Sequence, residues 1–286
     1  MSTATQPSLT YKLGGQFTIN RLGYGAMQLT GPGVFGEVKD RENAKKVLQE
    51  AVAAGVNFID TAEAYGPKLN ESLIADALYP YKKDLIIATK GGFARPGAGQ
   101  WVPNGDPAFI RENIDSSLKR LKTDTIDLWQ LHRIDPNFPV EETLAPVVDA
   151  VKAGKIKHVG LSEVDVKEIE RAQKVLPIVS VQNLYNLGNR KWEPVLDYTI
   201  QNGLAFIPWY PLASGPDSLA GKINKIAAAH KATTAQIALA WLLQRADNIL
   251  LIPGTGSIDH LHENMEAANI ELSAEEFETL TAPTAG

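Results

Sequence analysis

The feature that most constrains the fold is a regular alternation of short apolar runs with segments whose apolar residues recur at helical spacing. From Leu22 onward the chain has eight such runs, each followed by an amphipathic segment. This order is typical of parallel strands joined by right-handed crossovers, and eight is the number of strands that closes a barrel. The sequence therefore predicts an α/β fold of the (β/α)8 TIM barrel type.

The expected elements follow directly from this pattern. Strands are expected at 22–27, 56–59, 85–89, 125–131, 155–161, 178–182, 204–207 and 249–252. Helices are expected at 40–54, 69–78, 107–121, 140–153, 166–175, 192–201, 218–230, 234–244 and 257–268, the last of them extra C-terminal helices. Ahead of the barrel, the runs at 11–13 and 17–19 flank Gly14-Gly15-Gln16, which predicts an N-terminal β-hairpin. The segment 93–106 is rich in Gly and Pro and is interpreted as an elaborated loop.

An open, doubly wound sheet is the alternative that the same alternation allows. That architecture usually binds a dinucleotide through a G-x-G-x-x-G turn after its first strand. Here the turn reads Gly-Tyr-Gly-Ala-Met-Gln, so the fingerprint is missing and the barrel is favoured. No low-complexity linker or shift in composition marks a second domain, and we expect one barrel domain over residues 1–286.

Composition narrows the class of partner. A chain of 286 residues with 44% hydrophobic side chains can build a large core. Its net charge of -5 and pI near 5.6, without a basic run, argue against a nucleic acid or an anionic membrane surface as partner. Small soluble molecules are the expected partners, and the residues do not indicate an oligomeric state.

Several kinds of chemistry are excluded or disfavoured by residue type. The chain has no cysteine, which excludes disulfides, a thiol nucleophile and a thiolate metal site. Its five histidines are scattered over different elements, so no metal site is expected. The polar N-terminus lacks the apolar core of a signal peptide and no run is long enough to span a membrane, so a cytoplasmic protein is the expectation.

Polar residues follow the apolar runs at the ends where a barrel carries its active site. Asp60 ends the second run, Lys90 the third and His132 the fourth, and Tyr65 lies five residues beyond Asp60. Further along, Ser162-Glu163 and Gln182-Asn183 end the fifth and sixth runs. Each residue alone is more often a cap, a solvated side chain or a core group, but such placement at successive strand ends favours a common site.

Here the sequence resembles the aldo-keto reductases over nearly its whole length. The resemblance rests on Phe58-Ile59-Asp60-Thr61-Ala62-Glu63-Ala64-Tyr65-Gly66, Ala88-Thr89-Lys90 and Asp127-Leu128-Trp129-Gln130-Leu131-His132. Downstream, Gly160-Leu161-Ser162, Val181-Gln182-Asn183 and Ile252-Pro253-Gly254-Thr255 fall where that family holds its cofactor. The resemblance implies reduction of an aldehyde or ketone to the alcohol with NADPH, NADH not being excluded.

The four residues of these motifs then have expected roles in catalysis. Reduction of a carbonyl needs a hydride for the carbon and a proton for the oxygen. Tyr65 is expected to supply the proton, with its pKa lowered by the Lys90 ammonium, which Asp60 holds charged and oriented. His132 is expected to donate a hydrogen bond to the carbonyl oxygen.

The resemblance also implies a set of cofactor-binding residues. Ser162 and Gln182 would hold the nicotinamide carboxamide and Tyr210 would stack on the ring, while Glu163 departs from the Asn of many relatives. Where relatives clamp the 2′-phosphate with Lys and Arg, this chain has Gly254 and His260, which predicts a modest preference for NADPH. The full set is Gly25, Ala26, Met27, Asp60, Ser162, Glu163, Gln182, Tyr210, Pro211, Leu212, Ser214, Gly254, Thr255, Gly256, Ser257, His260, Glu263 and Asn264.

The substrate pocket is expected to be walled by Met27, Tyr65, Trp101, His132 and Arg133. Aromatic and thioether side chains favour an apolar or aromatic aldehyde, whereas Arg95 and Arg133 either select an anionic group or lie in solvent. Reduction of pyridoxal is a more specialised alternative. A non-catalytic module that binds NADPH as a redox-sensing partner of a channel is the alternative from another class.

Overall fold

The chain forms a curled parallel sheet preceded by a small hairpin. The computed structural model describes residues 8–212 and 217–282. The hairpin consists of β1 (Thr10–Leu13) and β2 (Phe17–Asn20), which pair antiparallel. Seven strands form the parallel sheet in the order β11-β10-β9-β8-β5-β4-β3. They are β3 Tyr24–Gly25, β4 Phe58–Asp60, β5 Ile86–Gly91, β8 Ile126–Leu131, β9 Ile156–Ser162, β10 Ser180–Gln182 and β11 Ala205–Phe206.

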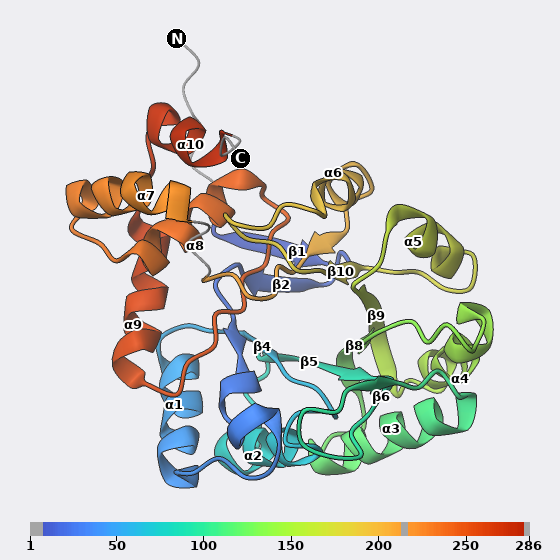
Figure 1. The fold of residues 1–286 in the computed structure, drawn as a ribbon. Helices are drawn as coiled ribbons and strands as arrows, with labels where there is room; N and C mark the ends of the chain where they lie inside the picture. The colour runs from blue at the N-terminus through green and yellow to red at the C-terminus, as the bar shows by residue number, and fades with distance from the viewer. Residues whose placement is uncertain (1–7, 213–216, 283–286) are drawn as a thin grey trace.

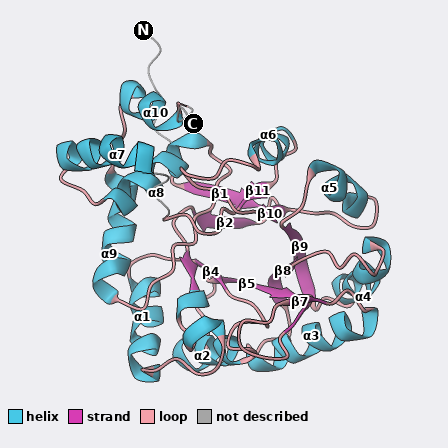
Figure 2. Ribbon diagram, in the orientation of Figure 1, coloured by secondary structure: helices cyan, strands magenta, loops and turns pink. Residues whose placement is uncertain are grey.

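Helices surround this sheet as an outer ring, with the strands at the centre (Figures 1 and 2). They are α1 Arg41–Ala53, α2 Leu69–Leu78, α3 Pro107–Arg120, α4 Val140–Lys152, α5 Val166–Gln173, α6 Glu193–Gln201, α7 Asp217–His230, α8 Thr234–Arg245, α9 Ile258–Glu266 and α10 Ala274–Thr281. Helix α10 was not foreseen as a separate element. In the described part of the chain no helix is long and apolar enough to cross a membrane.

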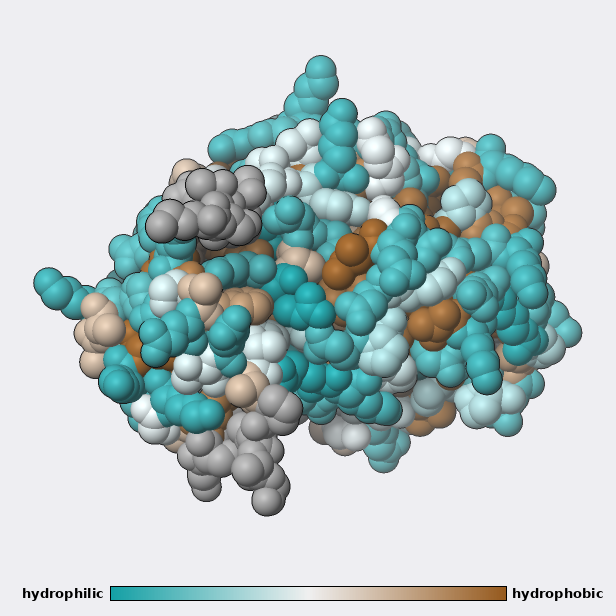
Figure 3. All heavy atoms as spheres, turned by 90° about the horizontal axis from the view of Figure 1, so that it is seen from above, coloured by the Kyte–Doolittle hydropathy of each residue, from teal (hydrophilic) through white to brown (hydrophobic). Residues whose placement is uncertain are grey.

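Local sequence explains where these helices begin. Helix α5 starts at a capping box, in which the Asp165 carboxylate accepts from the Glu168 amide and the Glu168 carboxylate accepts from the Asp165 amide. Thr233 and Gln236 cap α8 in the same way. Exposed faces carry the polar residues, and the face seen in Figure 3 is mostly hydrophilic with separate hydrophobic patches.

The eighth apolar run closes the barrel without forming a regular ladder of its own. Within 249–252, Ile249 bridges to Phe206 of β11 and Leu251 bridges to Leu22, both in the parallel sense. The predicted barrel fold is therefore confirmed, although its last strand is represented by isolated bridges.

Arg21 lies at this junction and is completely buried. Its guanidinium donates to the backbone carbonyls of Ser8, Leu243, Ala246 and Ile249. The exposed Asp247 carboxylate is 3.6 Å away. Arg21 thus joins the start of the barrel to its last quarter through hydrogen bonds to backbone carbonyl groups.

The hairpin covers the amino-terminal end of the barrel. Leu13 and Ile19 pack in one buried cluster with residues from the amino-terminal halves of the strands, among them Phe58, Ile86 and Leu128. The carboxyl-terminal ends lie opposite, and this is the side on which the polar residues emerge.

Two expected elements differ in detail. The run 22–27 is a strand only at Tyr24–Gly25, because Ala26–Gln28 forms a 3₁₀ turn whose Ala26 carbonyl accepts from the buried Asn70 amide. The segment 93–106 was interpreted as a loop. It contains two short antiparallel strands, β6 Phe93–Ala94 and β7 Val102–Pro103.

Candidate active site

Four polar side chains meet at the carboxyl ends of three adjacent strands. Asp60 ends β4, Lys90 is the next-to-last residue of β5, and His132 directly follows β8. Tyr65 belongs to the loop between β4 and α2, and its ring centroid is 5.9 Å from that of His132. Asp60, Tyr65 and His132 all line a cavity of about 520 Å³.

Lys90 links the carboxylate to the phenol. Its Nζ lies 2.5 Å from Asp60 Oδ1 and 3.2 Å from the Tyr65 hydroxyl, and it also donates to the Thr61 carbonyl at 3.0 Å. Lys90 is completely buried and Asp60 is 2% exposed. The ammonium is therefore fixed by three oxygen atoms. Of the residues in this hydrogen-bonded series, Tyr65 is the one beyond Lys90 that lines the cavity.

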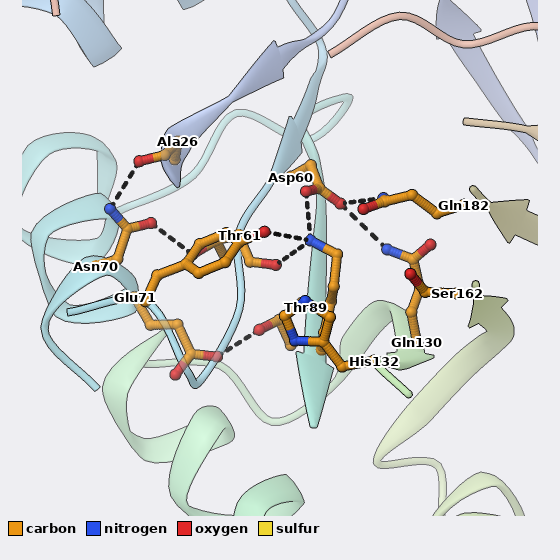
Figure 4. Close-up of polar contacts among 12 residues, drawn as sticks. Ala26, Asp60, Thr61, Asn70, Glu71, Thr89, Gln130, His132, Ser162 and Gln182 are labelled. Atoms are coloured by element: carbon orange, nitrogen blue, oxygen red, sulfur yellow. Dashed lines mark hydrogen bonds and ion pairs between the residues drawn. The ribbon is translucent and has the colours of Figure 1, made fainter. Parts of the chain in front are cut away.

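The second oxygen of Asp60 is held by two amides (Figure 4). Gln130 Nε2 lies 3.1 Å and Gln182 Nε2 2.9 Å from Asp60 Oδ2. Because a carboxylate only accepts, both amide groups must direct nitrogen toward it. The Gln130 oxygen is then buried without a partner among the described residues, whereas Gln182 lines the cavity. Gln130 was not among the expected site residues.

Burial and the neighbouring charges shift the pKa values of Tyr65 and Lys90 in opposite directions. Burial raises the pKa of Tyr65 above its ordinary value of 10, and this outweighs the lowering by the Lys90 ammonium. The expected net lowering of the Tyr65 pKa is therefore wrong. Burial alone would lower the pKa of Lys90, but Asp60 and Tyr65 together raise it. The pair is a neutral phenol beside a charged ammonium.

His132 is an uncharged imidazole at neutral pH. Burial, followed by the charges of Lys90, Arg133 and Arg95, lowers its pKa well below 6.5. Its Nδ1 is buried without a partner among the described residues. Phe93 packs edge-on against its ring with centroids 4.6 Å apart, so the imidazole is fixed in the cavity wall.

Polar groups behind the site hold the strand ends in place. Thr61 Oγ1 donates to Asn70 Oδ1 at 2.6 Å, which connects the end of β4 to α2. On β5, Thr89 Oγ1 donates to the buried carboxylate of Glu71 (Figure 4). This carboxylate also pairs with Arg120 at 2.7 Å. These contacts fix the backbone on which the cavity residues stand.

The expected cofactor residues fall into two groups. Those that line the cavity are Gly25, Met27, Asp60, Ser162, Gln182, Tyr210, Pro211, Leu212 and Gly254. A second group continues from Gly254 through the start of α9 and along this helix, namely Thr255, Gly256, Ser257, His260, Glu263 and Asn264. Ala26 is buried beside the cavity, and Ser214 lies outside the described residues.

Glu163 is already engaged by the protein. Its Oε1 accepts from the Leu184 amide at 2.5 Å and from Trp209 Nε1 at 2.8 Å. Its backbone has a positive φ of 54°, which turns the chain sharply after β9. Glu163 therefore ties the loop after β11 to the loop after β9.

The cavity residues offer the hydrogen-bond donor, the hydrogen-bond acceptor and the aromatic face that suit a nicotinamide ring with its carboxamide. Ser162 Oγ accepts from Arg133 at 3.0 Å, which leaves its hydroxyl hydrogen available to donate. Gln182 holds Asp60 through its nitrogen, which leaves its oxygen available to accept. Tyr210 is 66% exposed where it lines the cavity, and its ring offers a flat aromatic face.

The remaining cavity wall is mainly aromatic. Phe93, Trp101, Trp209, Val34 and Met27 line it together with Tyr65 and His132. Trp101 contacts the rings of Tyr65, Phe93 and His132 edge-on, with centroids 5.4 to 6.4 Å apart. Across the described ranges no group of three or more His, Cys, Asp or Glu residues could hold a metal ion.

Barrel enzymes carry their active sites at the carboxyl ends of the strands. The ionisable groups of this barrel lie at those ends, so the fold and the site are those of a barrel enzyme. The family model described as the Aldo/keto reductase family matches residues 21–283, and the chain belongs to this family. It is an oxidoreductase with an NADP-binding fold.

Comparisons with individual proteins agree with this family. Pyridoxine 4-dehydrogenase of Escherichia coli is 43% identical over 279 residues, covering 96% of this chain and 97% of that protein. An uncharacterized oxidoreductase of Schizosaccharomyces pombe is 50% identical over 267 residues, covering 93% and 87%. A thermostable aldo-keto reductase solved with the inhibitor epalrestat has a TM-score of 0.85 at 32% identity, covering 96% and 98%. An aldo/keto reductase of Klebsiella pneumoniae in complex with NADP and acetate has a TM-score of 0.80 at 28% identity, covering 96% and 94%.

Proposed function

We propose that this enzyme reduces an aldehyde or ketone to the alcohol with NADPH, using Tyr65 as the proton donor. The observation that carries the proposal is the hydrogen-bonded chain from Asp60 through Lys90 to Tyr65, which ends in the cavity. The bound cofactor supplies the hydride. A neutral phenol beside a fixed ammonium is suited to release its proton as negative charge develops on the carbonyl oxygen.

His132 orients the substrate in this proposal. We assign the imidazole proton to Nε2, which would donate to the carbonyl oxygen, while the buried Nδ1 makes no hydrogen bond within the described residues. Because the imidazole is uncharged, it fixes and polarises the oxygen without competing with Tyr65 as the acid.

The Ser162 hydroxyl and the Gln182 oxygen would hold the carboxamide of the nicotinamide, and Tyr210 would cover its ring. The donor set described above supports this assignment. Gly254 to Asn264 would then serve the phosphates and adenosine at the start of α9. With Gly254 and the exposed His260 in place of a cationic clamp, NADPH should bind more tightly than NADH by only a modest factor.

Reduction of pyridoxal is the second candidate. The 43% identity to pyridoxine 4-dehydrogenase and the aromatic cavity wall favour a substrate with a flat ring. The test is steady-state NADPH oxidation with a panel that includes pyridoxal, benzaldehydes and aliphatic ketones. Turnover of at least one carbonyl compound is expected. Tight NADPH binding without consumption on any of them would contradict the proposal and favour the non-catalytic binding module.

The pH dependence of reduction follows from the two shifted groups. We expect kcat/KM to stay level between about pH 6.5 and 9, since the lowered pKa of His132 keeps it neutral and the raised pKa of Tyr65 keeps it protonated. At higher pH the rate should fall, because deprotonation removes the proton donor. Steady-state kinetics across this range would test it, and a decline already between pH 6.5 and 8 would contradict these assignments.

Replacement of Gln130 tests the anchoring of Asp60. Gln130→Leu removes one donor to Asp60 Oδ2, and we expect kcat to fall about tenfold, because one hydrogen bond to a charged group contributes roughly 1.5–3 kcal/mol. The free energy of unfolding should fall by less than this amount, since the buried and unpaired Gln130 oxygen is removed as well. Ser180→Ala, which deletes a buried hydroxyl on the next strand but one, is the control and should keep normal kcat. If the kcat of Gln130→Leu is as high as that of Ser180→Ala and of the wild type, Gln130 does not position Asp60.

A further inference from the structure

Two arginines lie beside the cavity, and their hydrogen bonding differs. The Arg95 guanidinium uses all three of its nitrogens on backbone carbonyls. Nη1 donates to Ala64 at 2.8 Å, Nε to Gln100 at 3.0 Å and Nη2 to Gly33 at 3.3 Å. Its carbon also lies 3.5 Å from the centroid of the Trp101 ring. Arg95 therefore fastens three loop segments together.

Arg133 lines the cavity and keeps donors free. Only Nη1 has partners among the described residues, namely the His132 carbonyl at 2.5 Å and Ser162 Oγ at 3.0 Å. Both bonds hold the half-buried guanidinium in one orientation. Its Nε and Nη2 have no hydrogen-bond partner in the described part of the chain, and they are not among the fully enclosed unpaired atoms.

The charge of Arg133 is only partly balanced within the protein. Although burial lowers the pKa of Arg133, it does so from 12.5, so the group stays charged at neutral pH. Asp60 is paired with Lys90. The charge of Glu163 raises the pKa of Arg133, but the Glu163 carboxylate accepts from Leu184 and Trp209 and forms no ion pair with Arg133. No described carboxylate lies within ion-pairing distance of Arg133. A half-buried cation without an ion-pair partner favours an anionic ligand.

Phe93 lies close to both the Arg133 guanidinium and the His132 ring. Its ring packs against His132 at a centroid distance of 4.6 Å, and the Arg133 guanidinium carbon lies 5.6 Å from the same ring. A substrate that places its carbonyl at Tyr65 and His132 along this aromatic wall would bring a distal substituent toward Arg133.

We propose that Arg133 determines specificity by binding the carboxylate or phosphate of an anionic aldehyde whose carbonyl lies at Tyr65 and His132. This inference rests on the proposed function and names the substrate class of the same site. Neutral aldehydes are then poorer substrates, because they leave the cation without a partner.

The first test compares 4-carboxybenzaldehyde with its neutral isostere 4-formylbenzamide, using NADPH and the full-length enzyme. The wild type should favour the carboxylate by about 10- to 100-fold in kcat/KM, mainly through KM. This ratio should fall to near one in Arg133→Met and be partly restored in Arg133→Lys. In Arg95→Met, the matched control, the ratio should persist even where overall activity declines, since Arg95 only fastens loops.

The second test needs no turnover. Titration of benzoate and benzamide into the NADPH-bound protein should show tighter binding of benzoate, and Arg133→Met should remove the difference. A wild-type preference near one in both binding and turnover would overturn the inference while leaving carbonyl reduction intact. A tenfold rise in the NADPH Kd of Arg133→Met with an unchanged ratio would assign the guanidinium to a cofactor phosphate and would also overturn it. Absence of all turnover with retained benzoate selectivity would contradict the proposed reaction but support anion binding by Arg133.

Discussion

Tyr65→Phe is expected to lose reductase activity by roughly 10²- to 10⁴-fold while NADPH binding is retained. The substitution removes the hydroxyl that lies 3.2 Å from Lys90 and leaves the ring in its buried place against Trp101 and His132. Without this hydroxyl the developing alkoxide has no protein acid at the end of the Asp60–Lys90 chain. Steady-state turnover and fluorescence titration of NADPH with the same preparation would measure both effects.

A change away from the cavity serves as the control for Tyr65→Phe. Tyr79→Phe removes a hydroxyl from an exposed tyrosine after α2, and normal turnover is expected. If Tyr65→Phe keeps most of the activity toward a good substrate, Tyr65 is not the proton donor. If both NADPH binding and turnover are lost, the phenol has a structural role that the present assignment lacks.

Arg21→Met is expected to lower the free energy of unfolding by about 3–5 kcal/mol, because it leaves buried carbonyls without donors at the barrel closure. For a chain of this size the midpoint of thermal unfolding should fall by roughly 5–10 °C. Circular dichroism or calorimetry would measure it. The change lies far from the ionisable groups of the cavity, so the folded fraction should retain its substrate selectivity.

Arg171→Met is the matched control. Arg171 makes two hydrogen bonds of 2.6 Å to Glu141, but both side chains are largely exposed. Surface ion pairs of this kind contribute little, and a shift of less than about 2 °C is expected. Equal shifts in the two variants would mean that the carbonyl contacts of Arg21 do not stabilise the closure.

The alternation of apolar runs was sufficient to predict the barrel, because each strand and helix is specified by local periodicity. The hairpin and most helices, including α2 at Leu69–Leu78, lie where the pattern placed them within a few residues. The form of the last strand, at 249–252, was harder to predict, since its pairing depends on Leu22 and Phe206 rather than on its own residues.

Site residues could be predicted from the sequence where the chemistry requires a particular residue type. Residues whose place in the site depends on contacts with distant parts of the chain were harder to predict. Asp60, Lys90 and Tyr65 lie together as expected, although their roles remain predictions. Gln130 reads in the sequence as an ordinary polar residue within a strand, and its partner is 70 residues away. The engagement of Glu163 by Trp209 and the net raised pKa of Tyr65 likewise depend on packing that no local pattern contains.

The closure at Arg21 has a consequence for how the chain is made. The donors of Arg21 reach acceptors 222 and 228 residues further along, at Leu243 and Ile249. During synthesis the ring therefore cannot close until nearly the whole chain has left the ribosome, and until then β3 and β11 are open strand edges. Contacts of such large sequence separation form slowly, so the nascent chain is most exposed to mispairing with other chains just before its last strand arrives.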